Sequence, residues 1–443
     1  MSIIVDVKLW GVTIGKLAYD GEQTEVATFE YESNILNATQ QLSPLKVNNN
    51  KAIHSFEDIS YRTFKGVPGF IADSLPDKFG NQLIDQYFAD KGISAEEITT
   101  LDRLLYVGNR SMGGLEYEPQ KDISSKEKDS KLTLSDLAEL AEILLDSKKR
   151  FAQELEKSNR EQALNLLRIG SSAGGARAKA LVAIDKDGNI FDGTTIQKED
   201  CKYYLLKFDS SSNSDRDNKD PKGMTRIEYI YSLIAKKCDI NMPDTSYIEN
   251  DGDFHFLIER FDRIKVNNTI EKLHYVSWSG LAHAHRDETG AFSYEQHVLT
   301  ARELGLKDKD IKEIFKRAVF NIVGRNQDDH TKNFGFLMTK DGTWTLSPAF
   351  DMTYSYDPKG KWTKVHQIKF NNKQDHFTQE DIIEFASKCN VSKVKAIKIL
   401  ENTIENFTEF EKLADQHGVE NQLKNTVVNS LRMADYFNLP ILM

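Results

Sequence analysis

The chain has 443 residues, which is long enough for two or three domains of about 150 residues each. Its content of 39% hydrophobic and 28% charged residues is typical of a folded, soluble protein and not of a disordered one. A formal net charge of −10 argues against a protein that holds nucleic acid by neutralising phosphates with a basic face of its own.

Cysteine usage and hydropathy indicate the compartment. The three cysteines, Cys201, Cys238 and Cys389, are odd in number and far apart, which supports neither a disulfide framework nor a zinc knuckle. No stretch approaches the roughly 18 uninterrupted apolar residues of a membrane span, and the first residues lack a signal-peptide pattern. We expect a reduced, cytoplasmic protein with no membrane partner.

The first section of the chain is expected to be rich in β-structure. β-branched residues alternate with others over 3–7 and 12–17, and glycines punctuate the pattern. Farther on, capping residues precede an expected helix over about 78–91. The polar run 124–131 lacks periodicity and predicts a linker. We therefore place an N-terminal β-rich domain at 1–123.

The rest of the chain is expected to form two lobes. Apolar residues at helical spacing over 134–145 predict an amphipathic helix just after the linker. We place a lobe with a mixed sheet at 124–270 and a larger helical lobe at 271–443. The helical pattern of the last lobe is interrupted at 325–338 and 344–356.

The densest chemical signal is the segment 325–335, which concentrates acids, amides and bases after a helix-like stretch. Asp328 is followed five residues later by Asn333. This is the D-x-x-x-x-N spacing of kinase catalytic loops, in which the aspartate accepts the hydroxyl proton and the asparagine holds Mg²⁺. The alternative is a polar turn that caps a helix, which further kinase elements elsewhere in the chain disfavour.

A kinase also needs a second metal-binding carboxylate downstream, because Mg²⁺ prefers hard oxygen ligands. Asp351 supplies it. The apolar runs 334–338 and 344–346 flank an Asp-Gly pair, which predicts a hairpin that returns Asp351 to the neighbourhood of Asn333. Base and metal ligands are thus expected to converge on one site.

A lysine that pairs with phosphates is expected on a strand. Lys207 ends a strand-like run, and Glu228 is either its helix partner or an ordinary solvated glutamate. The glycine-rich segment 170–179 offers free amides and two cations, but it fits neither a Walker A loop nor the G-x-G-x-x-G of ordinary protein kinases. His283 and His285 lie two residues apart, which disfavours a zinc site and suggests a structural or substrate-proximal role.

Several motifs, in order over about residues 60–355, resemble the HipA toxin kinases. They are Ala-Asp-Ser-Leu-Pro-Asp at 72–77, Gly-Gly-Ala-Arg-Ala-Lys at 174–179, Glu-Arg-Phe-Asp-Arg at 259–263, Asp-Asp-His-Thr-Lys-Asn-Phe at 328–334 and Ser-Pro-Ala-Phe-Asp-Met at 347–352. The resemblance implies an α/β fold of the two-lobed protein-kinase type, with a β-rich N-terminal subdomain and a large helical C-terminal lobe. ATP and Mg²⁺ are the cofactors that it implies.

The resemblance also implies roles for the residues already singled out. It makes Asp328 the catalytic base, Asn333 and Asp351 the Mg²⁺ ligands, and Lys207 the phosphate clamp. These roles agree with those inferred from motif spacing.

Further roles come from the resemblance alone. Glu259 and Phe261 are expected to meet the adenine through their backbone, and His330 and Lys332 to belong to the nucleotide site. Ser172 is expected to be autophosphorylated, with the adjacent serine as the alternative position.

The function implied is that of a serine/threonine-protein kinase toxin of a type II toxin–antitoxin system. Its target by resemblance is a serine of an aminoacyl-tRNA synthetase, such as glutamyl-tRNA synthetase. A HipB-like helix-turn-helix antitoxin would restrain it and make the main contact with operator DNA. Two alternatives remain open, a nucleotide-binding pseudokinase that acts as a regulator and a small-molecule phosphotransferase.

Overall fold

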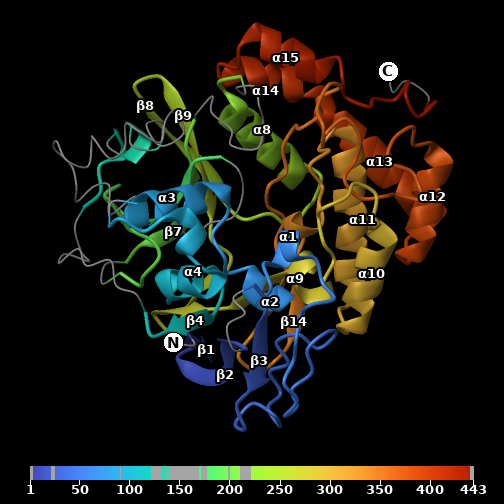
Figure 1. Cartoon of the computed structure of the whole chain (residues 1–443). Helices are drawn as coiled ribbons and strands as arrows, with labels where there is room; N and C mark the ends of the chain where they lie inside the picture. Colours follow the sequence, from blue (N-terminus) through green and yellow to red (C-terminus); the bar gives the residue numbers. More distant parts are fainter. Residues whose placement is uncertain are drawn as a thin grey trace.

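The chain is a mixed α/β protein in which two sheet-rich sections precede a helical one (Figure 1). The computed structural model describes residues 3–20, 25–89, 91–120, 131–135, 137–139, 141, 169–170, 177–197, 200–209 and 221–439. The predicted boundary at 123 falls outside these residues, and the one at 270 falls within a short hairpin, so both stay predictions.

The N-terminal section is a four-stranded antiparallel sheet with short helices. Its strand order is β3-β2-β1-β4, so the last strand returns to pair with the first. Buried residues alternate with partly or fully exposed ones along β1, as expected for a sheet with one covered face. The elements are β1 (Ile4–Leu9), β2 (Val12–Tyr19), β3 (Ala27–Tyr31), α1 (Tyr61–Phe64), α2 (Gly69–Ala72), α3 (Lys78–Ala89), η1 (Ala95–Glu97), α4 (Thr100–Val107) and β4 (Leu115–Glu118).

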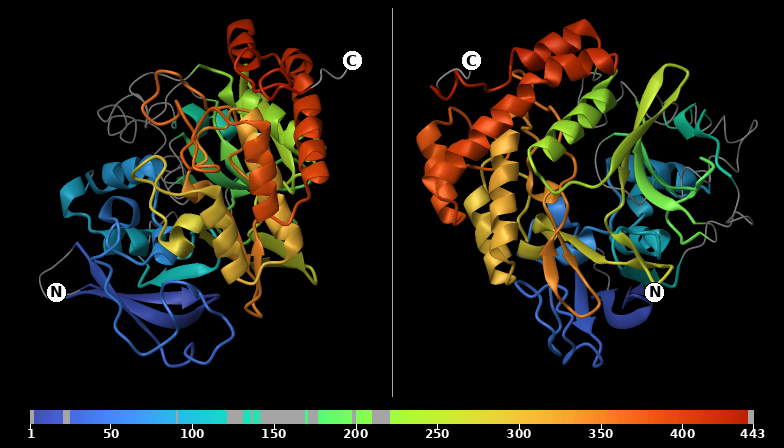
Figure 2. Two further views of the ribbon diagram at one scale, coloured as in Figure 1. Left: turned by 90° about the vertical axis from the view of Figure 1, so that its right-hand side faces the viewer. Right: turned by 180° about the vertical axis from the view of Figure 1, so that it is seen from behind.

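The middle section is a five-stranded sheet of order β6-β5-β7-β9-β8. All four of its strand pairs are antiparallel, so the expectation of a mixed sheet was wrong. Its elements are β5 (Lys179–Ile184), β6 (Ile190–Asp192), β7 (Lys202–Lys207), α8 (Met224–Lys237), β8 (Thr245–Asn250) and β9 (Asp253–Glu259). Helix α8 buries Ile227, Ile230 and Ile234, whose spacing puts them on one face. Figure 2 shows α8 between this sheet and the C-terminal helices, and it contacts both β9 and α14.

The C-terminal section begins with two small antiparallel sheets and continues as packed helices. Its elements are β10 (Arg263–Val266), β11 (Thr269–Lys272), β12 (His274–Ser277), α9 (Trp278–Ala282), α10 (Tyr294–Glu303), α11 (Asp308–Val323), η2 (Thr331–Asn333), β13 (Gly335–Met338), β14 (Trp344–Leu346), α12 (Gln379–Lys388), α13 (Lys393–Thr408), α14 (Phe410–Gln416) and α15 (Asn421–Val428). Helix α11 is amphipathic and buries most of one side among its neighbours.

The irregular part of this section is longer than the sequence predicts. Between β14 and α12, residues 347–378 form no helix or strand, whereas helical structure was expected to resume after 356. Isolated backbone bonds, such as those between Lys369 and the start of α10, hold this segment. The buried Asp329 carboxylate adds bonds to His366 Nδ1 and to the Gln367 N–H. Among the described residues, no helix is both long and apolar enough to cross a membrane.

Candidate active site

Lys207, the last residue of β7, holds two carboxylates. Its Nζ lies 2.6 Å from Glu228 Oε1 and 2.5 Å from Asp351 Oδ1. Glu228 on α8 is 2% exposed, so it is the lysine's partner and not a solvated side chain. Burial alone would lower the pKa of Lys207, but the carboxylates of Asp351 and Glu228 raise it above its usual value. The ammonium therefore stays charged.

Asp351 reaches Lys207 because β13 and β14 form the predicted hairpin. The residue has a φ of +56°, and its carbonyl accepts a 3.5 Å hydrogen bond from Asn326 Nδ2. Burial alone would raise the pKa of Asp351, yet the neighbouring Lys207 lowers it below its usual range. The side chain is thus an ionised carboxylate, as a metal ligand must be.

Asp328 and Asn333 lie on the loop that follows α11. The Asn333 amide Nδ2 donates a 2.8 Å hydrogen bond to the Asp328 carbonyl, and the Asp328 N–H donates to Ser355 Oγ at 2.9 Å. The Asp328 side chain is 48% exposed. Both backbone groups of Asp328 are therefore hydrogen-bonded, while its carboxylate reaches solvent, where a hydroxyl substrate could approach it.

Asp329, to which the sequence analysis assigns no role, anchors the same loop. Its Oδ2 accepts hydrogen bonds from Tyr294 Oη at 2.8 Å and His366 Nδ1 at 2.8 Å. Its Oδ1 accepts the Gln367 N–H at 2.8 Å, and the side chain is fully buried. Arg432 extends the network, since its Nη1 lies 3.0 Å from His366 Nε2. The Asp-Asp pair was visible in the sequence, but its partners are 35 or more residues away.

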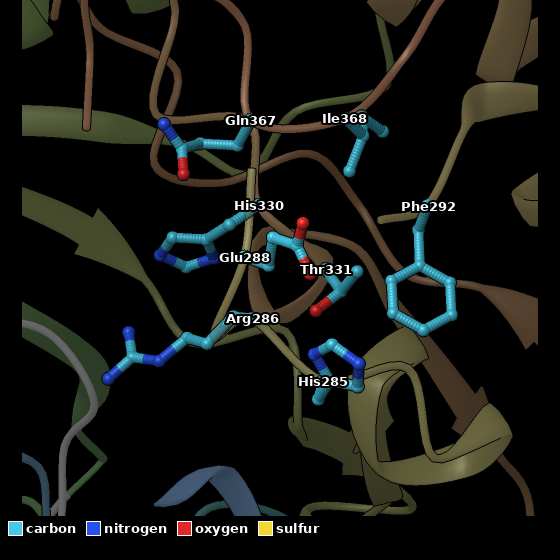
Figure 3. A pocket seen from close by; sticks show the side chains of 8 residues that line it. All are labelled: His285, Arg286, Glu288, Phe292, His330, Thr331, Gln367 and Ile368. Atoms are coloured by element: carbon cyan, nitrogen blue, oxygen red, sulfur yellow. The ribbon is translucent and has the colours of Figure 1, made fainter. Parts of the chain in front are cut away.

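His330, which the resemblance assigns to a nucleotide site, lies on the same loop between Asp328 and Asn333. Burial lowers the pKa of His330 to about 4, so the imidazole is neutral at pH 7. Its Nε2 is 3.9 Å from Asp328 Oδ1, which is too long for a hydrogen bond. Figure 3 shows His330, Arg286 and Gln367 extending to the same side of a small pocket. This pocket has room for about 10 Å³, which suits a water molecule and not a nucleotide.

The other nucleotide-site candidates lie at the end of β9. The Glu259 N–H donates a hydrogen bond to Asp244 O at 2.8 Å. Of its two backbone groups, the carbonyl is therefore the one that could bond to an adenine. The Phe261 ring lies 5.7 Å from that of Phe350, next to Asp351. The turn that follows β9 is held in place, because Arg260 and Arg263 both pair with the buried Asp262.

Ser171, Ser172 and most of the glycine-rich segment lie outside the described residues. The end of that segment is described, and it contains Lys179, one of the segment's two cations, to which the sequence analysis assigns no individual role. Lys179 opens β5, lies directly opposite Lys207 in the β5–β7 register and is 2% exposed. Lys332 lies on the loop that follows α11, with its Nζ 3.8 Å from Asp73 Oδ1.

Two family models match the chain. One, described as the HipA-like C-terminal domain, matches residues 171–410, and the other, the HipA N-terminal domain, matches residues 5–118. The chain belongs to the HipA family. The resemblance of the motifs is thereby confirmed.

Two curated relatives of this HipA family member share about a quarter of the aligned residues with it. The putative kinase Y4dM of Sinorhizobium fredii is 23% identical over 42% of the chain and 47% of the relative. A putative kinase of Haemophilus influenzae is 24% identical over 43% of the chain and 63% of the relative. The chain thus spans between about half and two thirds of these curated relatives.

A solved structure shares the fold over nearly the whole chain. A chain of the Shewanella oneidensis HipA, HipB and operator DNA complex superposes with a TM-score of 0.63 at 14% identity. The match covers 96% of this chain and 94% of the other. The predicted HipA-type α/β architecture is therefore confirmed.

The oxygen atoms of this HipA site suit a hard cation, which the oxygens of a phosphate group would also coordinate. Asn333 uses its amide nitrogen on Asp328 O, which leaves its amide oxygen as a ligand, and Asp351 supplies an ionised carboxylate. Among the described residues, no three His, Cys, Asp or Glu side chains gather into a metal site of their own. Such a set fits Mg²⁺, which usually binds through one or two carboxylates together with substrate phosphates.

Proposed function

We propose that this HipA family member is an ATP- and Mg²⁺-dependent serine/threonine-protein kinase that acts as the toxin of a toxin–antitoxin pair. The observation that carries the proposal is the ion triad of Lys207, Glu228 and Asp351, with both distances below 2.7 Å. In protein kinases a strand lysine paired with a helix glutamate holds the nucleotide phosphates. Asp328 and Asn333 lie on the loop that such a kinase uses for the acceptor and the metal.

The residues divide the work of phosphoryl transfer. Lys207 holds phosphate oxygens, and Glu228 keeps its ammonium oriented. Asp351 and the Asn333 amide oxygen would hold Mg²⁺, which neutralises charge on the transferring group when bound. The exposed Asp328 carboxylate orients the incoming hydroxyl and accepts its proton. Catalysis of this kind comes mainly from positioning and electrostatics.

The two alternatives make different demands on the site. A pseudokinase regulator has no need for an ordered catalytic loop, but Asp328 is held by Ser355 and Asn333. A small-molecule phosphotransferase shares the same metal chemistry, and its acceptor would be a metabolite. Only assays of the acceptor separate it from a protein kinase.

Autophosphorylation offers the first test. Wild-type protein and Asp328→Ala are incubated with ATP and Mg²⁺, and each is measured by intact mass spectrometry with peptide mapping over 169–179. We expect one phosphate, on Ser172 or Ser171, in the wild type alone. A phosphate in both proteins would contradict the role of Asp328. No phosphate in either, together with no transfer to any protein, would favour the alternatives.

Substrate and partner need a second test. By resemblance we propose a serine of an aminoacyl-tRNA synthetase as the target, with glutamyl-tRNA synthetase as the first candidate. Purified synthetases are incubated with labelled ATP and either wild type or Asp328→Ala.

Because the chain carries a net charge of −10, we propose that a HipB-like helix-turn-helix antitoxin makes the main DNA contact. If expression of the wild type arrests growth and co-expression of this antitoxin relieves the arrest, the pairing is supported.

A further inference from the structure

One short stretch of the N-terminal section touches both sides of the candidate site. It runs between α2 and α3 and carries two aspartates, Asp73 and Asp77. Asp77 Oδ2 lies 3.0 Å from Lys179 Nζ on the five-stranded sheet. Asp73 Oδ1 lies 3.8 Å from Lys332 Nζ on the catalytic loop. Two carboxylates of one segment thus meet two lysines of different sections.

Lys179 lies at the place where phosphates would bind. It pairs with Lys207 in the antiparallel β5–β7 register, and directly opposite residues project from the same face of a sheet. Its side chain is 3% exposed and that of Asp77 is 8% exposed, so the pair is shielded from solvent. A lysine buried in this way needs a partner to stay charged. Asp77 is such a partner.

Asp77 is also held in orientation by its own helix. Its other oxygen, Oδ1, accepts the Gly80 N–H at 2.6 Å and so caps the start of α3. One carboxylate therefore joins the helix terminus to Lys179. The position of the lysine is tied to the position of α3.

Asp73 is fixed just as firmly against the C-terminal section. It accepts hydrogen bonds from Ser277 N at 2.7 Å and Ser277 Oγ at 2.9 Å. Gly280 permits this approach, because a Cβ there would lie 2.3 Å from Asp73 Oδ2. The carboxylate next to Lys332 is thus held by the start of α9. Lys332 immediately precedes Asn333, the proposed metal ligand.

We propose that Asp73 and Asp77 are positioning residues for phosphoryl transfer, through which the N-terminal section holds Lys332 and Lys179 in place across the site. This inference rests on the kinase function proposed above. Its consequence is that the section matched by the HipA-like C-terminal domain does not contain the whole catalytic arrangement. The N-terminal section is then part of the active site's scaffold.

The test compares single variants of the full-length protein. Asp77→Asn keeps the shape of the side chain but removes the charge that faces Lys179, and Asp73→Asn does the same for Lys332. The matched control is Asp85→Asn on α3, whose carboxylate pairs with Arg103 at 2.7 Å within the N-terminal section. We expect kcat/KM for ATP to fall roughly 10- to 100-fold in the two site variants, as for small misplacements of positioning groups. The control should change it less than about 2-fold.

Two further measurements separate positioning from general loss of structure. Equilibrium binding of a fluorescent ATP analogue with Mg²⁺ should weaken in Asp77→Asn, and Asp77→Glu should recover part of it. Adding Asp77→Asn to Lys179→Met should cost no more than Lys179→Met alone, because the aspartate acts through that lysine. Thermal melting identifies any variant that fails to fold, and Asp77→Glu then carries the comparison.

The outcomes distinguish this inference from the proposed function. If the wild type transfers phosphate and Asp77→Asn binds and transfers as the control does, the inference is overturned while the kinase function stands. Additive losses in the double variant, or a gain of activity in Asp77→Asn, would overturn it as well. If the wild type transfers no phosphate to any acceptor, the proposed function fails and the inference fails with it.

Discussion

Replacing Lys207 with methionine tests the ion triad most directly. The change removes the cation that faces Glu228 at 2.6 Å and Asp351 at 2.5 Å. Glu228 has a side chain that is 3% exposed, so it is left as a buried, unpaired carboxylate. Breaking a buried pair in this way costs about 3–5 kcal/mol. At about 2–4 °C per kcal/mol for a unit of 150–250 residues, the melting midpoint should fall by roughly 6–20 °C.

The pH dependence of that loss has a definite sign. Burial already raises the pKa of Glu228, against the opposing effect of Lys207. Without the lysine the folded-state pKa rises further, so the folded protein binds a proton that the unfolded chain releases. The deficit of Lys207→Met is therefore largest near neutral pH and shrinks as the pH falls toward the unfolded-state pKa of about 4.3.

A double variant separates stability from chemistry. Lys207→Met with Glu228→Gln removes both buried charges and should regain much of the melting midpoint, but it should transfer no phosphate. Melting is followed by circular dichroism between about pH 5 and 8, and transfer by labelled ATP. A single variant that keeps wild-type transfer would refute the phosphate-clamp role. A double variant no more stable than the single one would refute the buried-pair reasoning.

Three further predictions concern neighbouring residues. Asp329→Asn should lose about 2–4 kcal/mol of stability and at least about 10-fold in kcat, because the amide cannot accept from all three donors; melting and initial rates check this. His330→Gln should leave the pH–rate profile unchanged between about pH 6 and 8, since burial already lowers the pKa of His330 to about 4. Glu259→Ala should change KM for ATP by less than about 2-fold, because its side chain pairs at 3.4 Å with the solvent-exposed Lys202 and such surface pairs contribute little.

Local patterns predicted the secondary structure that carries several candidate site residues. The hairpin that brings Asp351 back toward the catalytic loop follows from two apolar runs around an Asp-Gly turn, and the structure has it as β13 and β14. Lys207 was correctly placed at the end of a strand. These features depend on residues close together in the chain, where turn chemistry and periodicity apply.

The partners of the site residues could not be predicted in the same way. Whether Glu228 faces solvent or Lys207 depends on how α8 packs against the sheet. Asp329 meets His366 and Gln367, which are more than 30 residues away and lie in the segment 347–378 that has no helix or strand. Irregular segments carry no periodic signal, so their tertiary contacts cannot be predicted from sequence periodicity. The segment that contains Ser172 remains a prediction.

The three lysines of the site explain why so many carboxylates surround it. Lys179, Lys207 and Lys332 come from three different elements, and like charges in a poorly solvated region repel. Each is matched by at least one carboxylate, from Asp77, Glu228 with Asp351, and Asp73. Of these carboxylates only that of Asp351 is also proposed to bind a metal. Mg²⁺ and Lys207 would then compete for the Asp351 carboxylate. Binding of the metal should therefore weaken the ion pair between Asp351 and Lys207. The Lys207 ammonium would then pair with Glu228 and with phosphate oxygens.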